Sequence, residues 1–303
     1  MNSKLPARPG LATELAFESL LLITAVIWGL GFVAQRIGLE DLPPFAFNAA
    51  RFALGALSLV PVILLRRTSR ARLRACLVPA LIAGVVLTLA ASLQQLGMQY
   101  TSAGKGGFIT GLYVVLVPIA GIALGRKTAA NTWLGVVLTF AGLFLLSVTE
   151  NFSINKGDLL VLLGAFFWAA HILVLDRFAP KVDPIVLAAL QFLVCALLTG
   201  TTAFVFETPT AAGFSGAFPA IAFSGLLTIG LGFTLQAIAQ TKAHPARASI
   251  IMSLEAMFAA IGGWIILGER LSPRELAGCA IMLSGMIVAQ LPPVRRRLLK
   301  QPA

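Results

Sequence analysis

The chain is dominated by apolar runs, each about as long as a lipid bilayer is thick. A spanning helix needs about 20 mostly apolar residues, because the hydrocarbon core is about 30 Å thick and a helix rises about 1.5 Å per residue. Turn residues and charges separate the runs. Ten such runs occur, at roughly 17–38, 44–65, 75–99, 102–124, 130–149, 157–178, 184–206, 217–241, 245–267 and 273–292. The alternating pattern of a transmembrane barrel is absent. The sequence therefore predicts an all-α membrane protein with ten transmembrane helices.

The composition and charge of the chain agree with this prediction. Hydrophobic residues make up 58% and charged residues only 12%, whereas soluble domains carry about 25% charged residues. A net charge of +11 would suggest a nucleic-acid partner in a soluble protein. Here the basic residues lie between apolar runs, so we expect no nucleic acid and a lipid bilayer instead. The three cysteines match no metal or disulfide spacing, and we expect no cofactor.

The distribution of lysine and arginine predicts the orientation in the membrane. With a cytoplasmic N-terminus, 17 of the 23 basic residues fall in cytoplasmic segments, 4 fall outside and 2 lie within helices. This bias places both termini in the cytoplasm, and it agrees with an even number of helices. We expect the membrane to be the plasma membrane, the inner membrane of a bacterium. We expect a cytoplasmic N-terminal tail over 1–16 and a basic cytoplasmic tail over 293–303.

The two halves of the chain show a weak internal repeat. An offset of 140 residues aligns Trp28 with Trp168, and the helix boundaries superpose in the same register. An offset of 143 aligns two glycine pairs, Gly135 with Gly278 and Gly142 with Gly285. The sequence therefore predicts a first five-helix repeat over 17–149 and a second over 157–292. Five is an odd number, so the second repeat is inverted in the membrane, which is typical of secondary transporters.

Several motifs give the sequence a family resemblance. They are Trp28-Gly29 in the first run, the stretch from Tyr100 to Val115, Leu267-Gly268-Glu269-Arg270 after the ninth run, and Gly278 to Gly285. In this order and spacing the chain resembles the EamA branch of the drug/metabolite transporter superfamily. The resemblance implies two inverted five-helix repeats, a central cavity, and export or exchange of small solutes such as amino acids.

The chain departs from the family pattern at two places. It has Glu255-Ala256 where relatives often have Glu-Pro in the ninth helix, and Leu124-Gly125-Arg126 where the first repeat would carry Leu-Gly-Glu. The absence of the proline leaves open whether the ninth helix is kinked.

Charged residues inside the apolar runs are candidates for function, because a charge in the bilayer is costly. Glu255 lies near the middle of the ninth run, and we expect it to couple transport to protons or solute. Alternatively, Glu255 is a structural carboxylate paired with a basic group or a helix end. Arg51 lies inside the second run, either as a contact for a substrate anion or a partner of Glu255, or as a structural arginine. Lys105 and Arg247 lie near helix ends, where long side chains snorkel, and are candidates to guard the cavity mouths.

Polar residues at helical spacing form a stripe on three of the runs. The stripes are Thr24, Trp28, Gly31 and Gln35; Thr88, Ser92, Gln95 and Gln99, with Gln94 one position off; and Thr228, Gly232, Gln236 and Gln240. Amides facing lipid would lack partners, so these faces should point inward. They line a wet cavity or, alternatively, form hydrogen bonds between helices without one.

The stripes and neighbouring aromatic residues give a set of expected solute contacts. Tyr113 supplies a hydroxyl and an aromatic wall, and His171, one turn beyond Trp168, is either a proton relay or a hydrogen-bonded core histidine. The predicted contacts are Trp28, Gln95, Tyr113, Trp168, His171 and Gln236.

The sequence thus predicts a secondary transporter that moves a small-molecule solute, with protons as a coupling partner, by alternating access. We expect no enzyme, because phosphate-binding loops and the common hydrolase and zinc-protease motifs are absent. Two alternatives stand beside it. A membrane-embedded lipid-modifying enzyme would need a nucleophile or metal cluster at interface depth, and a non-transporting membrane sensor would have no need of buried polar stripes.

The charge bias yields a topology test. A green fluorescent protein fused after Ala303 should fluoresce, and alkaline phosphatase fused there should be inactive, because the C-terminus is expected in the cytoplasm. The same phosphatase inserted near Lys156 should be active. An active phosphatase at the C-terminus would contradict the predicted orientation.

Overall fold

The computed structural model describes residues 11–123, 130–148, 154–240 and 251–291, and every named element within them is helical. Helices suit a membrane, because they pair their own backbone groups where no water is available. The elements are α1 (Leu11–Asp41), α2 (Pro44–Leu65), α3 (Arg70–Met98), α4 (Ala103–Thr110), α5 (Tyr113–Ala123), α6 (Ala130–Ser147), α7 (Lys156–Phe178), η1 (Ala179–Lys181), α8 (Pro184–Phe206), α9 (Ala211–Gly216), α10 (Phe218–Ala222), the π-helix η2 (Phe223–Gly232), α11 (Phe233–Gln240), α13 (Glu255–Leu267) and α14 (Pro273–Gln290).

The helices agree with a multi-pass membrane protein. Among the described residues, eight are long and apolar enough to cross a membrane, and a shorter apolar helix covers Ile251–Leu267. The helix α14 occupies the tenth predicted run. The all-helical class is therefore confirmed, while ten spans in two inverted repeats stay a prediction.

Side-chain caps explain why several helices begin where they do. A cap accepts a hydrogen bond from a backbone N–H that would otherwise lack a partner. Ser69 does this for α3, which begins at Arg70, five residues before the predicted run, because the cap precedes a charged first turn. The other such caps are Ser102 of α4, Asn155 of α7, Asp183 of α8, Thr210 of α9 and Ser272 of α14.

Two of the predicted runs are interrupted near their centres. The run 102–124 breaks at Gly111 and Leu112, where Leu112 N–H donates to the Ile109 carbonyl and so tightens the turn. In the ninth run the helix is interrupted at Leu254, whose N–H donates to the Ile251 carbonyl in the same way. The interruption occurs without the proline that relatives often have after this glutamate.

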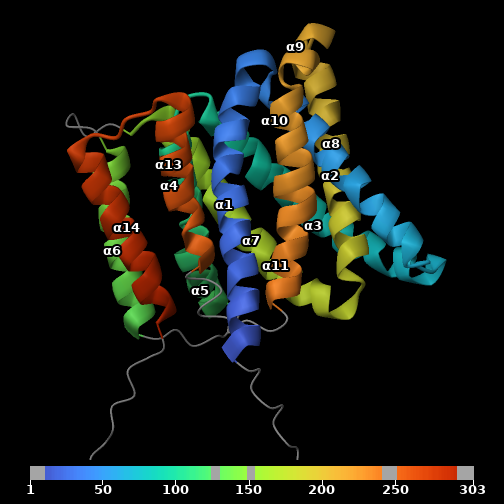
Figure 1. Cartoon of the computed structure of the whole chain (residues 1–303), viewed down its shortest axis with the longest axis horizontal. Helices are drawn as coiled ribbons and strands as arrows, with labels where there is room; N and C mark the ends of the chain where they lie inside the picture. The colour runs from blue at the N-terminus through green and yellow to red at the C-terminus, as the bar shows by residue number, and fades with distance from the viewer. Residues whose placement is uncertain (1–10, 124–129, 149–153, 241–250, 292–303) are drawn as a thin grey trace, which may run out of the picture.

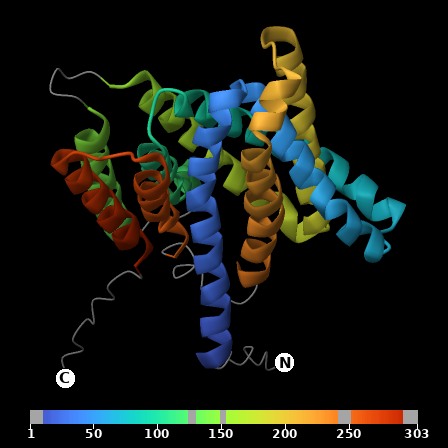
Figure 2. The same ribbon diagram turned by 45° about the horizontal axis from the view of Figure 1, so that its top comes forward.

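Figure 1 shows how the helices pack around one another. The pair α6 and α14 lies at one end, α1, α4 and α13 lie in the middle, and α2, α3 and α8 lie at the other end. The helix α3 packs on both α7 and α8, and α1 and α2 both pack on η2. In Figure 2, α1 begins and α14 ends on the same side of the molecule.

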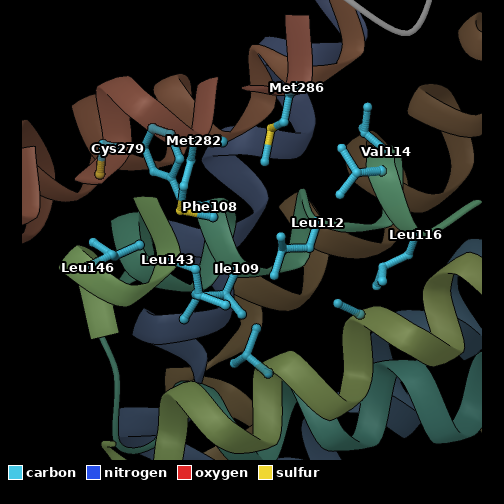
Figure 3. Close-up of a cluster of buried hydrophobic side chains, with 14 of the residues drawn as sticks. Phe108, Ile109, Leu112, Val114, Leu116, Leu143, Leu146, Cys279, Met282 and Met286 are labelled. Atoms are coloured by element: carbon cyan, nitrogen blue, oxygen red, sulfur yellow. The ribbon is translucent and has the colours of Figure 1, made fainter. Parts of the chain in front are cut away.

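Glycines allow α6 and α14 to approach closely. A Cβ on Gly135 would lie 2.5 Å from the carbonyl oxygen of Gly285, and one on Gly142 would lie 2.6 Å from that of Gly278. Such distances admit only hydrogen, so both helices need glycine at these positions. Buried apolar side chains from α4, α5, the break between them, α6 and α14, including Phe108, Leu112, Leu146 and Met282, join this pair to the rest of the fold (Figure 3).

The α6–α14 contact yields a stability prediction. Gly142→Ala should destabilise the protein by about 1–3 kcal/mol, because its Cβ would press on backbone atoms of α14. Gly200→Ala in α8 is the matched control, since its Cβ would meet only Ala49 at an ordinary 3.6 Å. Thermal unfolding midpoints in detergent measure both. Equal midpoints for the two variants would contradict the close contact.

Candidate functional site

The two interrupted helices meet at a buried carboxylate. Tyr113 is the first residue of α5 and Glu255 the first residue of α13, so each directly follows a break. The Tyr113 hydroxyl donates a hydrogen bond to Oε1 of Glu255 over 2.8 Å. Glu255 is 3% exposed. A buried carboxylate with a hydroxyl partner can bind a cationic group or exchange a proton, and interrupted helices are where secondary transporters place such groups.

Small residues hold the surrounding helices against Glu255. A Cβ on Gly29 of α1 would lie 2.7 Å from the Glu255 carbonyl oxygen, and one on Gly107 of α4 would lie 2.5 Å from the Ala259 Cβ. The helices α1 and α4 therefore both contact α13 closely. Of the glycines in the Tyr100–Val115 motif, Gly104 and Gly107 serve this packing, whereas Gly106 lies against Met98 and Gly111 against Met286.

The two tryptophans that the repeat aligns are tied to helices of the opposite half. Trp28 on α1 donates from its indole nitrogen to the Thr228 carbonyl of η2 over 2.9 Å, and its ring lies 5.0 Å from that of Phe233. Trp168 on α7 donates to Oε1 of Gln94 on α3 over 2.7 Å. The carbonyl that Trp28 reaches belongs to a π-helix, a geometry frequent at functional sites.

Glutamines on α1 and α3 form a buried network. Gln94 donates to Oε1 of Gln35 over 2.8 Å, and its own Oε1 also accepts from Thr110. Gln95 donates to the Gln35 carbonyl over 3.3 Å, and its Oε1 has no partner among the described residues. Sequence reasoning named Gln95 but left Gln94 off the stripe. Both are buried because α3 is covered by α7 and α8 as well as by α1.

His171 is held in the interior of the same region. Its Nε2 lies 2.9 Å from Oε1 of Gln191 on α8, and its ring lies edge-on to Trp168 with centroids 6.0 Å apart. His171 is 1% exposed. Gln191 was not singled out in the sequence, since no regular stripe marks it. Gln236, on α11, is half-buried.

The three basic candidates have different surroundings. Arg51 is buried, and its Nε donates to Oδ1 of Asn48 over 2.8 Å rather than pairing with Glu255. Lys105 on α4 forms an ion pair with Glu275 on α14 over 2.5 Å. Arg247 lies outside the described residues.

A polar pocket of about 390 Å³ opens beside Lys105 at the end of the bundle where α1 ends. Its walls include Arg36, Lys105, Glu269, Arg270 and Glu275. Arg36 donates to the carbonyls at the end of α3, as snorkelling toward a helix end predicts. A second cavity, of about 720 Å³, lies between α2 and α8 and is mainly apolar. Neither cavity is lined by the predicted solute contacts.

Glu269 of the Leu-Gly-Glu-Arg motif fastens the start of α4. Its carboxylate accepts from the backbone N–H groups of Ala103 at 2.8 Å and Gly104 at 3.3 Å. Gly268 makes the turn into this position with φ at +66°, which favours glycine. This joins the start of α4 to the segment between α13 and α14, and the Lys105–Glu275 pair joins it to α14 itself.

Comparisons with known proteins give the same class. The family described as the EamA-like transporter family matches this chain twice, over residues 16–148 and 155–290. An uncharacterized transporter of Archaeoglobus fulgidus is 29% identical over 89% of this chain and 84% of its own length. The uncharacterized inner membrane transporter YedA of Escherichia coli is 30% identical over 48% of each chain. The crystal structure of one other protein shares the fold, with a TM-score of 0.66 at 19% identity over 91% of this chain and 96% of its own.

The chain belongs to the EamA-like transporter family. It is therefore a multi-pass membrane transporter that acts on small solutes.

The cap on α4 can be tested through stability. Glu269→Ala should lower stability by about 1–3 kcal/mol, because two N–H groups at the start of α4 lose a charged acceptor. Glu40→Ala, at an exposed position near the end of α1, serves as the control. Thermal unfolding in detergent compares them. The same midpoint for both variants would show that Glu269 does not hold α4.

Proposed function

We propose that this protein is a secondary transporter that exports or exchanges a small metabolite, an amino acid or a related solute, by alternating access between two inverted five-helix halves. The observation that carries the proposal is the hydrogen bond between Tyr113 and Glu255, which joins one interrupted helix of each half at a buried position.

The helix contacts support the inverted repeat. In the predicted repeat, α1 corresponds to α7, α2 to α8, and α3 to η2 with α11. The α3–α7 contact then corresponds to the contact of α1 with η2 and α11, and the α3–α8 contact corresponds to that of α2 with η2. The same correspondence converts the Gly135–Gly285 approach into the Gly142–Gly278 approach. The two tryptophans follow this rule as well, each reaching a helix of the other half. Two halves with matching contacts suit a rocking motion between two equivalent states.

In this mechanism the solute lies against Trp28, Gln95, Tyr113, Trp168, His171 and Gln236. Glu255 couples the motion to protons or to solute charge, because a group that binds its carboxylate competes with the Tyr113 hydroxyl. A ligand shifts an equilibrium only through different affinities for the two states. Breaking the bond that joins the two halves supplies such a difference.

The contacts around α4 act as one gate in this proposal. The Glu269 cap fastens α4 to the segment between α13 and α14, and the Lys105–Glu275 ion pair fastens it to α14. Opening the protein at this end requires these contacts to part. The expected setting is the plasma membrane of a bacterium, with both termini cytoplasmic.

The role of Glu255 can be measured in proteoliposomes. Uptake of labelled amino acids driven by a proton gradient should fall about 10- to 100-fold in Glu255→Gln, because a charged hydrogen-bond acceptor is lost. The exposed Glu40→Gln should transport like the parent protein. Unchanged pH-dependent flux in Glu255→Gln would remove Glu255 from the coupling role.

Tyr113→Phe separates the hydrogen bond from the carboxylate. It removes the hydroxyl but keeps the ring, so transport should fall about 10- to 100-fold, as expected for a hydrogen bond of about 1.5–3 kcal/mol to a charged group. Coupling to pH should persist, since Glu255 remains. A variant with normal flux would show that this hydrogen bond does not join the halves during transport.

A further inference from the structure

A second buried charge lies on α2. Arg51 lies in the first half of this helix and is 5% exposed. A guanidinium carries five N–H donors, and the described residues engage one of them, from Nε to Oδ1 of Asn48 over 2.8 Å. Asn48 is itself held by α3, since its Nδ2 donates to the Ala91 carbonyl over 3.1 Å. The position of the guanidinium is therefore determined by two helices.

Arg51 is a buried charge without an ion-pair partner among the described residues. Ion pairs there join Arg66 to Asp183 and Lys105 to Glu275, and Arg51 takes part in neither. A buried arginine that only stabilises a fold is normally paired with a carboxylate or spends its donors on backbone carbonyls. Arg51 has neither kind of partner among the described residues, so its charge and most of its donors are available to a ligand.

Aromatic rings hold the guanidinium at the edge of a continuous wall. The Arg51 Cζ lies 4.9 Å from the ring centroid of Phe52, which stabilises a cation through the ring face. From Phe52 the ring contacts continue through Phe192 at 6.1 Å and Phe233 at 5.3 Å, and end at Trp28 at 5.0 Å. Arg51 and a predicted solute contact thus border the same apolar wall.

We propose that Arg51 binds the carboxylate of the transported solute, so that this protein selects small organic carboxylates with an apolar body. The inference rests on the proposed transport function and names the substrate class for it. One guanidinium matches the single charge of a carboxylate and can bind its two oxygens side by side. A phosphate ester carries a charge of about −1.5 to −2, and the aromatic wall presents only this cation. Phe233 and Trp28, the partly exposed rings at the far end of these contacts, then accommodate the apolar part of the solute.

The first experiment compares acids with their amides on the unmodified protein. Purified full-length protein is screened by thermal shift with the twenty amino acids, acetate and succinate, and with the amides of leucine, threonine, phenylalanine and lysine. Ligands that bind the folded state raise its stability. We expect at least one acid to stabilise the protein and its amide to bind about 10- to 100-fold more weakly, the loss typical of a charged hydrogen bond.

Three results of this screen would overturn the proposal. They are equal stabilisation by acid and amide, no stabilisation by any carboxylate, and stabilisation by sodium chloride or sodium sulfate alone that matches the best carboxylate. The comparison needs no variant, so it tests the site even where a substitution at Arg51 prevents folding.

The second experiment assigns the effect to Arg51. Arg51→Gln should bind acid and amide equally, and Arg51→Lys should keep part of the difference, because it retains the charge but not the paired donors. Arg72→Gln, at an exposed position near the start of α3, should behave like the parent protein. A full acid preference in folded Arg51→Gln would refute the assignment.

Flux measurements separate this inference from the proposed function. Wild-type protein that binds acids through Arg51 in the screen but moves no labelled acid into proteoliposomes would contradict transport and keep the site. Wild-type protein that moves acid and amide at equal rates would keep transport and contradict the site.

Discussion

The interior of this protein depends on one constraint, that polar groups inside a membrane must find partners within the protein. The described structure meets it mainly with bonds between helices. Gln94 on α3 ties together α1 and α7, and Gln191 on α8 holds His171 on α7. Trp28 on α1 reaches the backbone of η2. Each bond is weak alone, about 0.6 kcal/mol on average in a membrane protein, but together they determine which helix faces surround the centre.

Some of these bonds also connect the two predicted halves. The bonds of Trp28 to η2 and of Trp168 to Gln94 run from one predicted half to the other, and so do the close backbone approaches at Gly135 and Gly142. Tyr113 and Glu255 meet where the two interrupted helices cross. The contacts of a group placed there would change with the relative position of the two predicted halves, whereas those of a site within one half would not.

Charged residues divide into two groups by their surroundings. Glu269 caps α4, and Glu207 caps α2 by accepting from the N–H groups of Phe45 and Ala46 at 3.0 and 2.8 Å. These carboxylates lie at helix ends, complement the positive end of the helix dipole and need no ligand to account for them. Glu255 and Arg51 lie deep in the bundle, with one hydrogen-bond partner each among the described contacts. Depth and partners, rather than charge itself, separate structural from functional candidates here.

By itself the sequence determined the membrane class, the family, the approximate helix limits and the burial of most stripe residues, because these follow from hydrophobicity and period along one chain. It also singled out Glu255 and Tyr113, one as a rare charge and the other as an aromatic residue in a glycine-rich run. Only the tertiary structure decided that they bond to each other, that Gln94 rather than Gln95 binds Trp168, and that Arg51 lies against Phe52. The physical reason is that Tyr113 and Glu255 lie 142 positions apart and Gln94 and Trp168 lie 74 apart, whereas the side chains of the neighbours Arg51 and Phe52 are oriented by the helices that pack on α2. A repeat in the sequence does not specify how two packed helices are oriented about their own axes.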